Sequence, residues 1–172
     1  MQTVEALLLD DHGQIDDLLK DAFGAVDAGA YGAAFDKLDL FWAHLAMHIR
    51  AEHLHLFPSI LSRCGEGATT LNAHEILELL RDDHNFFMHE LARAIKSLRA
   101  AGDEDAASTW GTVRAQLIHL RERLTEHNRI EETHVYPLLG ALMDGVESDH
   151  LAGLLKKELD NLPPRFRTGE SG

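Results

Sequence analysis

Apolar side chains recur every three or four residues through four long segments of the chain, which is the period of an amphipathic α-helix. The segments are residues 8–26, 38–56, 77–98 and 110–138. Glycine-bearing breaks separate them at residues 29–32, 64–70 and 102–105. Because short connections between long helices favour antiparallel neighbours, we expect an all-α fold, an up-down-up-down four-helix bundle.

The bundle is expected to occupy residues 1–145, since Asp144 and Gly145 end the fourth helical pattern. Residues 146–172 are expected to form a short C-terminal helix and a flexible tail. The apolar positions of that helix are Leu151, Leu154, Leu155 and Leu159. The tail from Pro163 onward is expected to be frayed.

Charge and composition exclude several classes of partner. The chain of 172 residues is 45% hydrophobic and carries a formal net charge of −13, from 16 basic and 29 acidic residues. Such a surface repels phosphate backbones and anionic lipids, so neither nucleic acid nor a membrane is an expected partner. The single cysteine, Cys64, cannot form an internal disulfide, and the N-terminus lacks the basic flank of a signal peptide. We expect a cytoplasmic protein, monomeric or a weak homodimer.

Polar residues interrupt the apolar stripe of every helix at one level. His48 and Glu52 follow one another on the second stripe, and His127 and Glu131 do so on the fourth. His12 and His84 stand among leucines on the first and third stripes. A buried carboxylate without a partner costs several kcal/mol, and no Lys or Arg lies on the stripe at that level. Cations held between the four imidazoles and the two carboxylates would neutralise the negative charge of the two glutamates.

The two halves of the chain repeat these motifs. The triplet Asp-Asp-His occupies residues 10–12 and 82–84, and the pattern His-x3-Glu-x2-His-x-aromatic-Pro occupies residues 48–58 and 127–137. A duplicated helical hairpin explains the repeat and predicts a pseudo-two-fold axis through the site, which suits two similar ions. Mixed imidazole and carboxylate ligands favour Fe, Mn, Zn or Cu over Ca and Mg. Iron is the first expectation and manganese the second, with zinc as a further substitute.

These motifs resemble the hemerythrin-like (HHE cation-binding) family, over roughly residues 7–142. The resemblance implies a non-haem di-iron centre in a four-helix bundle. By that resemblance, His12, His48, His84 and His127 are iron ligands, and Glu52 and Glu131 bridge two irons beside an oxo or hydroxo group. Oxygen-carrying members place another histidine four residues after the one on the third helix, where this chain has Met88. His89, one residue later, points about 100° away around the helix.

Several residues near the six are candidates for an outer shell around the metals. They are His55, His134, His53, Glu132, His44 and Tyr136. A surface position is the alternative for His55, His134, His53 and Glu132, and the last two could also act as extra or labile metal ligands. Tyr136 could instead approach the metals. The prolines after Phe57 and Tyr136 are expected to end or kink their helices. His74, His119 and His150 are interpreted as surface residues.

Three functions fit this pattern. The first is a di-iron oxidoreductase of the catalase or peroxidase kind that removes hydrogen peroxide or reacts with oxygen or nitric oxide; no catalytic acid or base is assigned. The second is a module that binds oxygen, nitric oxide or iron reversibly, for storage or sensing. The third is a bundle whose metals only stabilise the fold.

Overall fold

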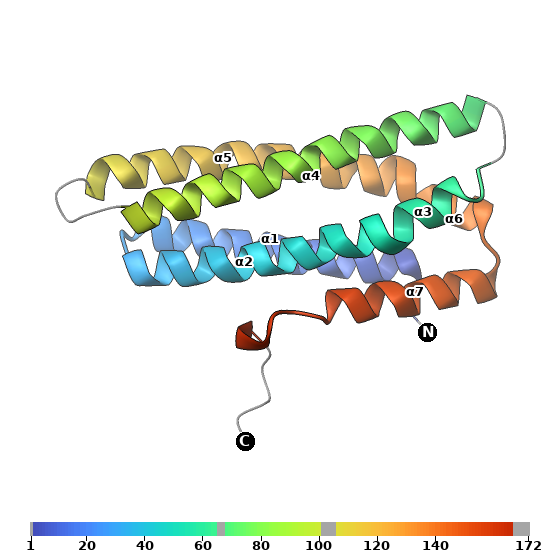
Figure 1. Ribbon diagram of the computed structural model, residues 1–172, viewed down its shortest axis with the longest axis horizontal. Helices are drawn as coiled ribbons and strands as arrows, with labels where there is room; N and C mark the ends of the chain where they lie inside the picture. The colour runs from blue at the N-terminus through green and yellow to red at the C-terminus, as the bar shows by residue number, and fades with distance from the viewer. Residues whose placement is uncertain (1, 65–67, 101–105, 167–172) are drawn as a thin grey trace, which may run out of the picture.

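Four long antiparallel helices form the body of the molecule, as the hydrophobic pattern predicts (Figure 1). The computed structural model describes residues 2–64, 68–100 and 106–166. The long helices are α1 (Val4–Asp27), α2 (Tyr31–Ala51), α4 (Ala68–Ala100) and α5 (Ala106–Ile130). Helix α1 packs against α2 and α5, and α4 packs against α2 and α5. The prediction of an all-α bundle is confirmed. The expected break at residues 102–105 lies outside the described residues.

Helices α2 and α5 each continue through a π-helical turn into a short α-helix. The π-helical turns are η1 (Glu52–Leu56) and η3 (Glu131–Val135), followed by α3 (Phe57–Leu61) and α6 (Tyr136–Leu142). In each turn the amide five residues on bonds back to the glutamate carbonyl, from Phe57 to Glu52 and from Tyr136 to Glu131. A proline follows each turn, and its ring cannot fit against the carbonyl four residues earlier. The prolines therefore widen the helix, whereas the sequence led us to expect an end or a kink.

A fifth substantial helix, α7 (Gly145–Leu159), lies against α2 and α1 on one side of the bundle (Figure 1). Asp144 and Glu147 form a capping box at its start, with bonds of 2.9 and 3.2 Å. Leu151 and Leu155 of its apolar face are buried. The segment that follows was expected to be frayed, but Pro164–Phe166 forms a 3₁₀ turn (η4). The rest of that expectation, residues 167–172, falls beyond the described part of the chain.

The turn between α1 and α2 depends on one glycine. Gly29 has a φ of 64°, in the left-handed region that favours glycine. The amide of Ala30 bonds to the carbonyl of Ala25 at 3.1 Å, so the last turn of α1 closes as a Schellman-type cap. At the other end of α1, the Thr3 hydroxyl accepts from the Ala6 amide at 3.2 Å. These caps set where α1 begins and ends.

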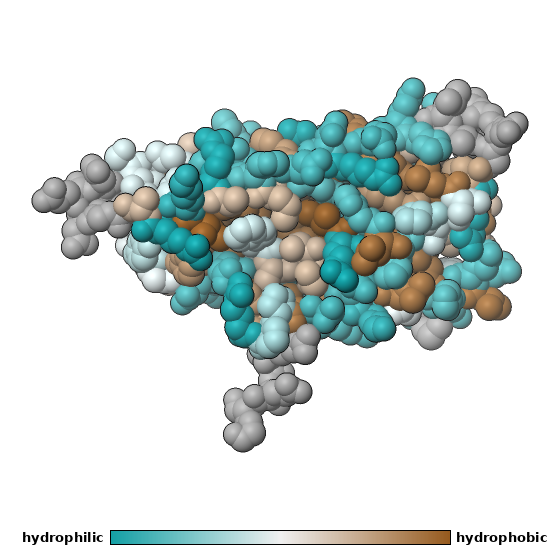
Figure 2. Space-filling model, in the orientation of Figure 1, coloured by the Kyte–Doolittle hydropathy of each residue, from teal (hydrophilic) through white to brown (hydrophobic). Residues whose placement is uncertain are grey.

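Two apolar clusters fill the bundle, one on each side of the polar level. One includes Ile15, Leu45, Phe87 and Leu124, and the other includes Leu8, Leu56, Leu80 and Val135. On each helix the polar residues lie between members of the two clusters. The outer face shown in Figure 2 is largely hydrophilic, with apolar groups scattered between the helices. None of the helices that the structure describes is long and apolar enough to cross a membrane.

Candidate metal centre

The polar level gathers six buried side chains from all four helices. His12 comes from α1, His48 from α2, His84 from α4 and His127 from α5, while Glu52 and Glu131 are the first residues of η1 and η3. None of the six is more than 4% exposed. They form two overlapping groups whose candidate ligand atoms lie within 4.8 Å of one another. The groups are Glu52, His84, His127 and Glu131, and His12, His48 and Glu131.

The two oxygens of each glutamate face two different histidines. Oε1 of Glu52 lies 3.3 Å from Nε2 of His48, and Oε2 of Glu52 lies 3.2 Å from Nε2 of His84. Oε2 of Glu131 lies 3.2 Å from Nε2 of His12, and Oε1 of Glu131 lies 3.4 Å from Nε2 of His127. Every imidazole therefore points its Nε2 atom at a carboxylate oxygen. Imidazole nitrogens and carboxylate oxygens that face one another in this way could hold metal cations between them.

The hydrogen bonds of these carboxylates are incomplete. Both oxygens of Glu52 and Oε1 of Glu131 are buried without a hydrogen-bond partner among the described residues. Their contacts with the imidazoles are close enough for an ion pair but are not directed as hydrogen bonds. Buried polar atoms are ordinarily satisfied, and an exception calls for an explanation. Cations between the imidazoles and the carboxylates would satisfy all three oxygens.

The other ring nitrogen of each histidine also has a partner. Nδ1 of His48 lies 2.8 Å from Oδ2 of Asp11, and Nδ1 of His127 lies 3.2 Å from Oδ2 of Asp83. Nδ1 of His12 lies 3.1 Å from Oε1 of Glu132. A nitrogen that donates its N–H in this way fixes the tautomer and leaves Nε2 free for a cation.

The fourth histidine is held differently. Nδ1 of His84 lies 2.8 Å from Nε2 of His53, so two imidazoles face each other. Both His53 and Glu132 come one residue after a glutamate of the cluster, on the rim of the buried layer.

Tyr136 enters the cluster from the end of η3. Its hydroxyl lies 3.0 Å from Nε2 of His12 and donates to Oε2 of Glu131 at 3.4 Å. The equivalent residue in the first half, Phe57, stacks on the His84 ring with centroids 5.9 Å apart and planes 6° apart. A π-helical turn brings the residue five positions on, rather than four, beneath the glutamate.

Charge–charge contacts shift the pKa values of the cluster. Burial alone lowers the pKa of His127, but Glu131 and Asp83 outweigh it and raise the pKa to about 9. Burial likewise opposes the shift of His48, whose pKa Glu52 and Asp11 raise well above its usual range. For Glu52, burial raises the pKa, yet His48 and His84 hold it well below its usual range. In the metal-free protein, protons on the imidazoles thus balance part of the buried negative charge.

The side chains predicted to surround the six differ in whether they reach the cluster. His53, Glu132 and Tyr136 contact the cluster, as described above. His55 instead faces α7, with Nε2 3.7 Å from Oε1 of Glu158. His134 is exposed and forms no hydrogen bond or ion pair with any described residue. Both histidines were predicted to lie around the site, but the widened turn after each glutamate rotates them away from the cluster.

The third helix carries no further histidine toward the cluster. His89 is exposed, and its Nδ1 donates to the Asn85 carbonyl oxygen at 2.7 Å. Met88 is half-buried, and its sulfur accepts from Nε1 of Trp42 at 3.2 Å. The side chain four residues after His84 is therefore held by Trp42.

The two aspartates that hold His48 and His127 were not among the predicted site residues. Asp11 and Asp83 directly precede His12 and His84, and their repetition in the Asp-Asp-His triplets was the available signal. Each aspartate reaches across to the histidine of a neighbouring helix rather than the one beside it in the chain. That crossing depends on how the helices pack, which the triplet does not reveal.

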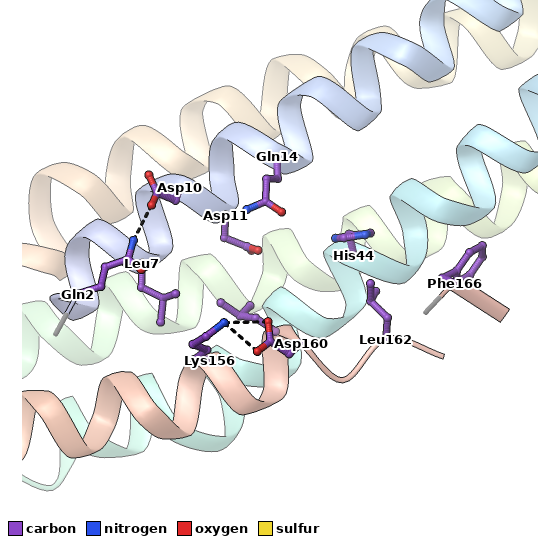
Figure 3. Close-up of a pocket in the computed structure, with 11 residues that line it drawn as sticks. Gln2, Leu7, Asp10, Asp11, Gln14, His44, Lys156, Asp160, Leu162 and Phe166 are labelled. Carbon is purple, nitrogen blue, oxygen red and sulfur yellow. Dashed lines mark hydrogen bonds and ion pairs between the residues drawn. The ribbon is translucent and has the colours of Figure 1, made fainter. Parts of the chain in front are cut away.

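A cavity of about 440 Å³ lies between α1, α2, α7 and the segment that follows α7 (Figure 3). Asp11, Gln14 and His44 line it from α1 and α2, and Leu162 and Phe166 line it from the segment after α7. Burial lowers the pKa of His44, although Asp11 acts in the opposite sense. His44 lines this cavity and is half-buried, so it does not belong to the buried layer. Because Asp11 also holds His48, the cavity reaches within one side chain of the cluster.

This fold and site define a helical bundle with a buried histidine–carboxylate cluster that is able to hold metal cations. A family model described as the hemerythrin HHE cation binding domain matches residues 3–139. The protein belongs to that family, which confirms the resemblance inferred from its motifs. Comparison with curated proteins and with solved structures found no match.

Proposed function

We propose that this protein holds two iron ions in the cluster and reacts there with small oxidants, hydrogen peroxide first. The observation that carries the proposal is the position of Glu52 and Glu131, each with one oxygen toward a histidine of either pair. The first metal position is defined by His12 and His48, and the second by His84 and His127. Both glutamates would bridge the two positions.

The donor atoms suit a redox metal. Each position offers two imidazole nitrogens and two carboxylate oxygens, a set that favours Fe, Mn or Zn over Ca and Mg. Structural zinc usually takes thiolates in a closed tetrahedron. The only cysteine, Cys64, packs against the apolar cluster around Leu56. Iron is therefore the first candidate, with manganese and zinc as substitutes.

Iron in these positions would supply reversible one-electron oxidation and reduction and open coordination positions for a small ligand. In peroxide removal, one molecule takes up two electrons and two protons to give two waters. A second molecule gives up two electrons and two protons to give oxygen. The protein must therefore hold the two irons together and move protons. Glu52 and Glu131 would hold the irons together.

Tyr136 is the residue best placed to move protons. Burial, together with the Glu131 carboxylate, raises the pKa of its hydroxyl well above the usual range. The hydroxyl therefore keeps its proton and stays a neutral donor beside His12. Asp11 offers a separate route, because it connects the cavity with the His48 ring.

The test is metal content and peroxide turnover of protein made in iron-supplemented cells. About two irons per chain, near-ultraviolet charge-transfer absorption and oxygen release that scales with bound iron are expected. The double variant Glu52→Gln/Glu131→Gln should lose the iron and the turnover. Glu122→Gln, an exposed glutamate on α5, is the matched control and should keep both.

Two other outcomes would point elsewhere. A reversible spectral change with oxygen or nitric oxide, without turnover, would indicate a binding, storage or sensing module. Stoichiometric zinc without any ligand reaction would indicate a structural metal site. Either result would overturn the proposed peroxide reaction.

A further inference from the structure

The contacts around the two metal positions repeat under the pseudo-two-fold relation of the chain. Asp11 contacts His48 as Asp83 contacts His127, each reaching the neighbouring helix. The residue after each glutamate also contacts a histidine on another helix. Glu132 contacts His12, and His53 contacts His84. The two halves therefore place equivalent positions in equivalent contacts.

The chemistry of those contacts differs at the position after each glutamate. At the first metal position, His12 has a carboxylate oxygen of Glu132 at 3.1 Å from Nδ1. At the second, His84 has the Nε2 atom of His53 at 2.8 Å. For His84 to turn Nε2 toward an ion, its Nδ1–H must be donated to the neutral His53 ring. A carboxylate acceptor raises the basicity of a ligating imidazole more than a neutral acceptor does.

A second difference concerns the aromatic residue after each π-helical turn. Tyr136 brings a hydroxyl oxygen to 3.0 Å from Nε2 of His12. Phe57, in the equivalent place, offers only a ring stacked on His84. The first metal position thus has an oxygen atom within reach that the second lacks.

Nearby charges differ in the same sense. Arg123 donates to Asp83 at 2.6 Å, and the Arg81 guanidinium lies 5.7 Å from the centre of the Phe57 ring. Both arginines therefore lie on the side of the second metal position. On the other side, Asp16 follows His12 by one helical turn. A cation is repelled more, and attracted less, at the second position.

We propose that the two metal positions are unequal: the position at His12 and His48 binds its ion tightly, and the position at His84 and His127 holds an exchangeable ion. This inference rests on the proposed di-metal function. The residue pair Glu132 and His53 sets most of the difference, because these two side chains contact Nδ1 of one histidine ligand in each position directly.

The test is a calorimetric and optical titration of metal-free protein with Co²⁺. Two binding steps with dissociation constants at least tenfold apart are expected. Glu132→His should weaken the tight step by ten- to hundredfold and leave the weak step unchanged. His53→Glu should strengthen the weak step. Both side chains lie at the surface rim, so neither change threatens the fold, and circular dichroism checks this.

The double exchange Glu132→His/His53→Glu keeps the composition and should reverse the order. Crystals grown with one equivalent of Co²⁺ locate the first ion by anomalous scattering, beside His48 in the unaltered protein and beside His84 in the double exchange. Glu122→His, on the exposed surface of α5, is the control and should change neither step. Equal occupancy at one equivalent, or unequal steps that ignore both exchanges, would overturn the inference. Binding of fewer than two ions would instead overturn the di-metal function on which it rests.

Discussion

The Asp83 carboxylate joins α4 to α5 at the level of the cluster, with Oδ2 3.2 Å from Nδ1 of His127. Its other oxygen accepts from Nε of Arg123 at 2.6 Å. One aspartate thus orients a candidate metal ligand and is itself held by an arginine whose guanidinium lies over Phe86, 4.3 Å from the ring centre. Burial opposes ionisation of Asp83, but His127 and Arg123 lower its pKa, so the carboxylate stays charged.

Replacing Asp83 by asparagine should weaken metal binding. An amide in this place can orient the His127 ring but does not raise its basicity. The expected loss of affinity is about ten- to hundredfold, measured by competition with a chelator. Asp82→Asn is the matched control, since Asp82 is the exposed neighbour in the chain. Equal affinity of the two variants would contradict the role assigned to Asp83.

Metal binding should release protons and strengthen as the pH rises. The pKa of His127 lies at about 9 in the metal-free protein, so an ion must displace its proton at neutral pH. Affinity should therefore rise by up to about tenfold per pH unit for each proton displaced. Calorimetry in buffers of different ionisation enthalpy counts these protons. Binding without proton release would show that His127 is not a ligand.

Stability of the metal-free protein should fall in mildly alkaline solution. Because the pKa of His127 is raised to about 9 from 6.5, its protonated form stabilises the fold. This contribution is complete below the unfolded pKa and is lost as the pH rises through about 9. Urea unfolding with a chelator present should show a loss on the order of 1 to 3 kcal/mol. A free energy of unfolding that stays constant between pH 6.5 and about 9 would contradict the charge pairing of His127 with Glu131 and Asp83.

Tyr136→Phe should separate metal binding from reactivity. The variant makes this position identical to Phe57 in the other half, so the fold and the bound metal should be retained. Peroxide turnover should fall by at least about tenfold, because a positioned proton donor is lost. Tyr31→Phe is the control, as Tyr31 is exposed. Unchanged turnover, measured as oxygen release per bound iron, would rule Tyr136 out as the proton donor.

The apolar cluster beyond the metal level should dominate stability. Leu91 is fully buried in it, whereas Leu79 on the same helix is 47% exposed. Leu91→Ala should lower the free energy of unfolding by about 2 to 5 kcal/mol. Leu79→Ala should change it by less than about 0.5 kcal/mol. Denaturant unfolding of the two variants measures the difference, and similar losses would mean that the core is placed elsewhere.

The helices and the polar level could be predicted from the sequence because both depend on local periodicity. Leucines at intervals of three and four define which face of each helix is buried, and His12, His48, His84 and His127 occupy that face. The repeat of the motifs in the two halves further predicts that equivalent residues gather around a pseudo-two-fold axis. Their role as metal ligands stays a prediction until metal content is measured.

Only the tertiary structure decided which neighbours support those residues. The widened turns after Glu52 and Glu131 turn His55 and His134 outward and bring Tyr136 inward, which a regular helical period does not foretell. Asp11 and Asp83 hold histidines on other helices, and Glu132 and His53 do the same. Contacts of this kind depend on distances between helices rather than on spacing within one. The sequence therefore determined the buried layer, and the packing of the helices decided how its two halves differ.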